Sequence, residues 1–176
     1  MPTLSDFFKP LTAAKKDRLK AVCFVKKHPE LLPELFQLAF SSKAMRKNRY
    51  ATWVVELLVL EDLNRLTPFL DLCVNAMASI SNSSMRRAIS KCLWYYFKEN
   101  NCNNLTQNQK EQLVNASLEW VLTEQKTAPL SFTIKLLSLF FDDIADLRNQ
   151  LKGFLIDSNR VFPKGLYPTF RIVFNN

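Results

Sequence analysis

Apolar residues recur at three- and four-residue spacing along almost the whole of this sequence. This spacing places them on one side of an α-helix, whereas a half-buried strand would need apolar and polar residues in alternation. The chain has only two glycines, Gly153 and Gly165, and tight β-turns and phosphate-binding loops depend on glycine. The sequence therefore predicts an all-α protein and disfavours a β-fold, a P-loop or a dinucleotide-binding fold.

The periodic segments predict eight or nine helices joined by short connections. Their expected spans are 11–27, 31–41, 44–60, 67–80, 83–98, 106–124, 128–141, 144–157 and 167–174. Residues suited to helix starts stand at many of these boundaries, with Ser83, Thr106 and Asp143 as N-caps and Pro33, Pro68 and Pro129 in first turns. Because the connections are short, neighbouring helices are expected to be antiparallel.

Short motifs repeat along the chain at the spacing of a helix pair. Leu31-Leu32-Pro33-Glu34-Leu35 recurs 35 residues later as Leu66-Thr67-Pro68-Phe69-Leu70, and Val74-Asn75-Ala76 recurs 40 residues later as Val114-Asn115-Ala116. Helix pairs of about 35 to 47 residues bury their apolar faces by stacking on one another. We therefore expect residues 1–176 to form a single domain: a HEAT/armadillo-like α-α superhelix, a short right-handed solenoid of about four helix pairs plus a terminal helix.

Three stretches resemble a family of small bacterial HEAT-like helical-repeat proteins. They are Leu31-Leu32-Pro33-Glu34-Leu35, Trp53-Val54-Val55-Glu56-Leu57 and Leu113-Val114-Asn115-Ala116-Ser117-Leu118-Glu119-Trp120. The resemblance covers most of the chain and rests on structural motifs. It implies the HEAT-like fold. Members often carry the label adenylosuccinate lyase, but the resemblance supplies no active-site residue.

The sequence departs from the lyase signature that this label would require. Enzymes of that superfamily use a loop of the form Gly-Ser-Ser-x-Met-Pro-x-Lys-x-Asn-Pro, whereas this chain has Ser41-Ser42-Lys43-Ala44-Met45-Arg46-Lys47-Asn48. The glycine and both prolines are missing. His28 is the only histidine, and it stands in a predicted turn without the nucleophile or carboxylate that a general base requires. We predict that the protein is not an enzyme.

The four cysteines show no spacing typical of a metal site. Cys23, Cys73, Cys92 and Cys102 include no CxxC pair, and three of them fall within apolar helical stripes, so buried free thiols are expected. No metal and no cofactor is predicted. The first residues lack a charged segment followed by an apolar core, and no apolar run is long enough to span a membrane, so we expect a cytoplasmic protein with no membrane partner.

The predicted helix 83–98 carries a stripe of cations around one tryptophan. Arg87, Lys91, Trp94 and Lys98 lie opposite its apolar side. Such a stripe suits the bases and phosphates of a nucleic acid, or an acidic peptide. In the alternative interpretation, Trp94 packs against a neighbouring helix and the cations only solvate an outer face.

A second polar stripe lies on the predicted helix 44–60. Arg49, Thr52 and Glu56 stand at positions i, i+3 and i+7, away from the apolar side of the helix. They form either a surface for a partner or an intrahelical network with no partner. The sequence does not choose between these two.

Three classes of function remain. A non-catalytic binding or scaffold module for a protein or peptide is the leading hypothesis, because helical repeats offer extended surfaces. Nucleic-acid binding is the alternative. It rests on Arg86, Arg87, Lys91 and Lys98 with Trp94, and on charge: residues 1–50 hold eleven Lys and Arg against four Asp and Glu, and residues 51–176 hold thirteen against twelve. An enzyme is the remote third class.

Overall fold

The computed structural model describes residues 3–43, 45–157 and 160–174, and this part of the chain contains ten α-helices and no strand. The helices are α1 (Leu4–Phe8), α2 (Lys15–Lys27), α3 (Leu32–Ala39), α4 (Arg46–Glu61), α5 (Leu70–Met77), α6 (Ser83–Asn100), α7 (Gln107–Thr123), α8 (Thr127–Ser138), α9 (Leu147–Lys152) and α10 (Tyr167–Phe174). The predicted all-α class is confirmed for these residues.

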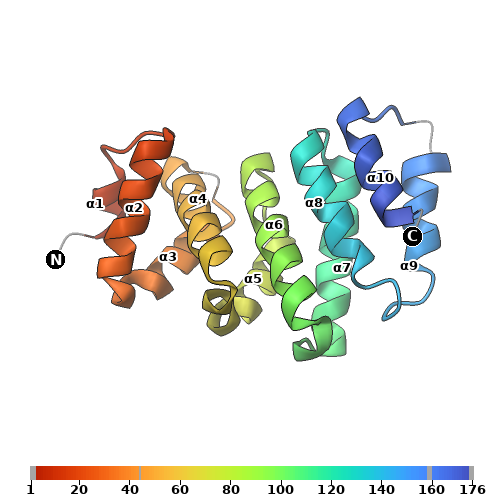
Figure 1. The fold of residues 1–176 in the computed structure, drawn as a ribbon, viewed down its shortest axis with the longest axis horizontal. Helices are drawn as coiled ribbons and strands as arrows, with labels where there is room; N and C mark the ends of the chain where they lie inside the picture. Colours follow the sequence, from red (N-terminus) through yellow and green to blue (C-terminus); the bar gives the residue numbers. More distant parts are fainter. Residues whose placement is uncertain (1–2, 44, 158–159, 175–176) are drawn as a thin grey trace.

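The even-numbered helices form one layer. Helices α2, α4, α6, α8 and α10 contact one another in chain order, while α3 packs on α4, α5 on α7, and α7 on α8. Figure 1 shows the helices side by side along the long axis of the molecule, with the two ends of the chain far apart. Each internal helix of the even layer therefore shares its faces with the preceding and the following even helix.

The sequence repeats match in burial at several positions, although residues 32–35 lie in α3 whereas residues 66–69 lie in a 3₁₀ helix. Leu35 of α3 and Leu70 of α5 are both buried, as are Val74 of α5 and Val114 of α7. The asparagines that follow these valines, at positions 75 and 115, are both exposed. The Val-Asn-Ala motifs thus present the same side of α5 and α7 to the interior.

The N-terminal region differs from the prediction of one helix over 11–27. A short helix, α1, precedes it, and α2 begins only at Lys15. The backbone N–H and the hydroxyl of Thr12 both donate to the Asp17 carboxylate, at 2.8 and 2.6 Å. These hydrogen bonds hold the connection ahead of α2 in a turn, which shortens the expected helix.

The predicted helices 67–80 and 144–157 are each interrupted. Residues Leu63–Phe69 form a 3₁₀ helix that contains Pro68, and α5 begins after it; proline lacks the N–H and crowds the preceding turn of an α-helix. The second segment starts late because Asp146, with φ of 63°, lies directly before α9, and it ends in the π-helical turn Gly153–Asp157.

The predicted N-caps have different outcomes. Thr106 caps α7 in a capping box with Gln109, as its position predicts. Asn82 caps α6 in place of Ser83. Asp143 accepts a hydrogen bond from Lys110 at 2.6 Å instead of capping a helix.

One apolar cluster runs through the molecule from Leu4 to Val173. Its largest fully buried side chains include Trp120, Tyr96 and Phe97. Three cysteines are buried as expected, but Cys23 is exposed because it lies on the outer side of α2. None of the helices in the described ranges is long and apolar enough to cross a membrane.

Candidate binding surface on helices α4, α6 and α8

Glu56 of α4 is the centre of an ion cluster that joins α4 to α6. Its side chain is nearly buried, and both carboxylate oxygens accept hydrogen bonds from the Arg87 guanidinium, at 2.8 and 2.5 Å. The Lys91 ammonium group donates to the same carboxylate at 3.1 Å. We call Glu56, Arg87 and Lys91 the Glu56 cluster. It contains two cations for one carboxylate.

Two opposing effects set the pKa of Glu56. Burial is the larger single effect and would raise the pKa, but the hydrogen bonds and charges of Arg87 and then Lys91 together outweigh it. The pKa of Glu56 is therefore lower than that of an ordinary glutamate, and the group is ionised at neutral pH. The cluster holds α4 and α6 together while leaving excess positive charge at the surface.

Trp94 lies one turn further along α6, in a half-buried position between α6 and α8. The ammonium groups of Lys98 and Lys135 lie 5.4 and 5.1 Å from the centre of its ring, and the ring of Phe132 lies 6.0 Å away. These distances permit cation–π attraction. We call Trp94, Lys98, Phe132 and Lys135 the Trp94 cluster.

Lys91 connects the two clusters. Its ammonium group lies 5.6 Å from the centre of the Phe132 ring while it also donates to Glu56. The two clusters therefore form one continuous surface over α4, α6 and α8, which we call the α6–α8 surface. Its cations are Arg87, Lys91, Lys98 and Lys135, and its aromatic side chains are Trp94 and Phe132.

The structure brings together some of the predicted site residues and separates others. Arg87, Lys91 and Glu56 meet, although the sequence assigns them to two different stripes. Arg49 is exposed on α4. Thr52 is only 2% exposed, and its hydroxyl donates to the carbonyl oxygens of Ala39 and Asn48 at 3.0 and 2.9 Å. Thr52 thus has a structural role, and the predicted stripe of α4 is not a continuous surface.

Arg86, which the nucleic-acid hypothesis includes, faces the interior. Its guanidinium donates to the Ile80 carbonyl at 2.9 Å and to the Thr123 hydroxyl at 3.0 Å, and it lies 5.3 Å from the Trp120 ring centre. Burial lowers its pKa, with the nearby Glu124 acting in the opposite direction. Arg86 therefore fastens α6 to α7 and offers no charge to a ligand.

Phe132 and Lys135 are the members of the α6–α8 surface that the sequence interpretation did not include. Both lie on α8, and their i, i+3 spacing places them on one face of that helix. This spacing was a usable signal. It identifies a shared face but cannot show that the face lies beside Trp94, which depends on the packing of α8 against α6.

His28 lies in a turn after α2, away from this surface. Its ring nitrogen Nδ1 is 3.1 Å from the Glu30 carboxylate, and both side chains are exposed. Among the described residues, no three His, Cys, Asp or Glu side chains gather as a metal site requires. Compared with known proteins, the chain matches no family model, no curated protein and no solved structure.

Proposed function

We propose that this chain is a non-catalytic helical-repeat module that binds a protein or peptide partner. The proposal includes a HEAT- or armadillo-like α-α superhelix, as in the family of small bacterial proteins that its motifs resemble. The successive contacts of the even helices and the equivalent burial of the repeated motifs support this architecture.

The observation that carries the proposal is the arrangement around Trp94. Lys98 and Lys135 lie over its ring, and neither forms an ion pair within the described residues. Carboxylates of a partner would supply the missing counter-charges, and a small apolar side chain of the partner, which needs less room than a stacked base, would contact Trp94 and Phe132. The surface is therefore suited to a peptide segment that combines acidic and apolar residues.

Nucleic acid is the second candidate, because Lys98 and Lys135 would also bind phosphates. Two observations make it the weaker one. The lysine ammonium groups and Phe132 occupy space around the Trp94 ring that a stacked base would need. Arg86 is also engaged inside the protein. A carboxylate can approach the lysines without displacing them from the ring.

A peptide-library selection tests the proposal. Displayed random peptides are selected against the wild-type protein, and the enriched sequences are then measured by fluorescence anisotropy. We expect enrichment of Asp and Glu beside an apolar residue, and binding about tenfold weaker in K98A/K135A, as expected when two charged contacts are lost. K126A/K152A is the matched control, because these lysines are exposed and lie outside the α6–α8 surface.

The proposal would be contradicted if no peptides are enriched, or if K98A/K135A and K126A/K152A lose the same amount of affinity for the enriched peptides. Labelled single- and double-stranded oligonucleotides are titrated in parallel at low salt. Saturable oligonucleotide binding that K98A/K135A abolishes, without peptide binding, would establish the nucleic-acid alternative. In that case affinity should fall steeply with added salt, because bound phosphates release counterions.

A further inference from the structure

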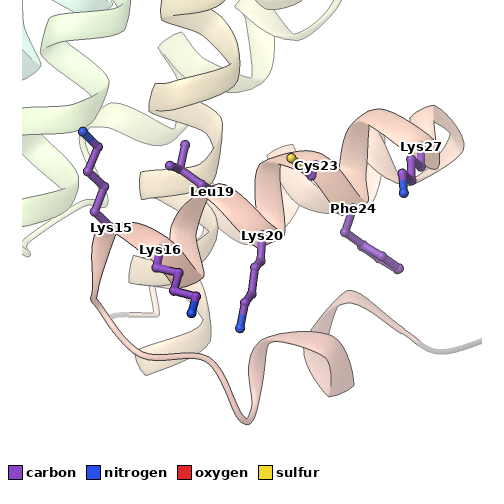
Figure 2. A pocket seen from close by; sticks show the side chains of 7 residues that line it. All are labelled: Lys15, Lys16, Leu19, Lys20, Cys23, Phe24 and Lys27. Carbon is purple, nitrogen blue, oxygen red and sulfur yellow. The ribbon is translucent and has the colours of Figure 1, made fainter.

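A second surface lies at the N-terminal end of the even layer, on the outer face of α2. Seven residues along this helix line an open groove of about 690 Å³ (Figure 2): Lys15, Lys16, Leu19, Lys20, Cys23, Phe24 and Lys27. The groove shares no residue with the α6–α8 surface. We call it the α2 groove.

The floor of the α2 groove is apolar. Leu19 is 45% exposed, and Cys23 beside it is also exposed. Phe24 points to the other side of the helix (Figure 2), where its ring stacks on Phe7 of α1 with ring centres 3.9 Å apart, so the exposed apolar strip consists of Leu19 and Cys23. On its other side α2 buries Ala21, Val22 and Val25, so Leu19 and Cys23 lie on the outward face of the helix.

The rim of the groove is strongly basic. Lys15, Lys16 and Lys27 form no ion pair with any described residue, and Lys20 has one long contact of 3.5 Å with Asp17. Lys15 therefore lies on one side of the strip formed by Leu19 and Cys23, and Lys16, Lys20 and Lys27 lie on the other, with little compensating negative charge. This rim is a large part of the charge excess in the first 50 residues.

We propose that the α2 groove binds an acidic amphipathic helix of a partner protein. An amphipathic helix brings apolar side chains at i, i+3, i+4 and i+7 to one face. These side chains would cover Leu19 and Cys23, and acidic residues beside them would pair with the lysines of the rim. The inference goes beyond the proposed function because it assigns a different surface and a helical ligand.

Two other occupants fit the groove less well. A second copy of the chain would have to offer an acidic surface, whereas the exposed apolar residues at its far end, Tyr167 and Ile172, stand beside Lys164 and Arg171. A membrane surface would require several protruding apolar side chains, but on this face Leu19 is the large apolar residue that is exposed, and Phe24 is held against Phe7.

A designed peptide provides the probe. Helix α2 has 13 residues, which span about 20 Å, so a fluorescein-labelled helical peptide of about 16 residues matches it, with leucines on one face and glutamates beside them. We expect saturable anisotropy binding that weakens with salt, because the rim charges are exposed. A peptide with the same composition in scrambled order should not bind.

Variants separate groove binding from general charge attraction. L19E should weaken binding about tenfold, because it replaces an apolar contact with a repelling carboxylate. K16E/K27E should also weaken it by at least about tenfold, whereas the charge-matched K126E/K152E, on residues outside the groove, should have a much smaller effect. Trp94→Ala should leave this binding unchanged, which distinguishes it from the proposed function.

Cys23 gives a footprint of the bound peptide. Since it is exposed in the groove and the other three cysteines are buried, bound peptide should slow its maleimide labelling about tenfold, because thiol modification requires access. The inference would be overturned if the peptide does not bind saturably, or if Cys23 is labelled at the same rate with and without saturating peptide. It would also be overturned if K16E/K27E and K126E/K152E weaken binding equally. Binding to vesicles of phosphatidylcholine and phosphatidylserine without peptide binding would also overturn it, in favour of a membrane surface.

Discussion

Glu56 and Arg87 stand 31 positions apart in the sequence and form a bidentate ion pair between α4 and α6. Both carboxylate oxygens are used, and Lys91 adds a third hydrogen bond. The pair thereby fixes one helix against the next in the layer that carries the α6–α8 surface. Removal of this ion pair should therefore lower the free energy of unfolding.

Glu56→Gln should lower the free energy of unfolding by about 1.5 to 3 kcal/mol, the cost of losing hydrogen bonds to charged groups. The Arg87 and Lys91 side chains are 27% and 24% exposed, so water partly screens them and the loss should fall short of that for a fully buried pair. Urea unfolding provides the measurement. Glu99→Gln, at an exposed position of α6, is the control, and an equal effect of both changes would contradict the role of the cluster.

Stability should decrease at acidic pH in part through Glu56. Its pKa is lowered in the folded protein, so its contribution is complete above the pKa of the unfolded chain, about 4.3. That contribution is lost as the pH falls through the folded value. Unfolding curves between pH 7 and 3 should show a smaller decrease for Glu56→Gln than for the wild type. Parallel curves for the two proteins would refute this assignment.

The cysteines should differ sharply in reactivity. Burial raises the pKa of the Cys73 and Cys92 thiols and raises that of Cys102 to about 11, whereas Cys23 is exposed. A thiol reagent at pH 8 should therefore react rapidly with Cys23 alone in the folded protein, and with all four cysteines after unfolding. Cys23→Ser should remove the fast phase; a second fast thiol would be inconsistent with the packing.

Arg160 should anchor the segment after α9 to the end of α7. Its guanidinium donates to the carbonyl oxygens of Val121 at 2.5 Å, Leu122 at 2.9 Å and Glu124, which lack helical partners at a C-terminus. Arg160→Ala should cost about 1 to 3 kcal/mol, because these carbonyls lose a charged donor. Arg160→Lys should recover only part of this, since an ammonium group cannot reproduce the planar fork. If Arg160→Lys restores the full stability of the wild type in thermal unfolding, the role of the planar guanidinium group would be contradicted.

The protein should not cleave adenylosuccinate. The Gly and Pro positions of the lyase loop are missing from residues 41–48, and the ring of His28 lies beside Glu30 and Phe24 in a turn. Incubation of purified protein with adenylosuccinate should release no fumarate above background. Fumarate release that depends on the protein and is abolished by His28→Ala would overturn this prediction.

The sequence by itself determined the helical class and most element positions. Apolar spacing of three and four residues acts within single helices, so it locates α4, α6, α7 and α8 closely. The Thr106 cap was also predictable, because its hydrogen bonds reach only three residues along the chain. The late start of α2 and the break at Asp146 were not predictable, because they depend on individual side-chain contacts and backbone angles.

Only the tertiary structure decided the composition of the candidate surface. Spacing indicated that Arg87, Lys91, Trp94 and Lys98 share a face, but not that Glu56 pairs with two of them or that Phe132 and Lys135 lie beside the tryptophan. Those contacts depend on the register in which α4, α6 and α8 pack. Packing register results from the fit of many buried side chains across helices, and no local pattern encodes it. For the same reason, Thr52 and Arg86 look like surface residues in the sequence but face other helices in the fold.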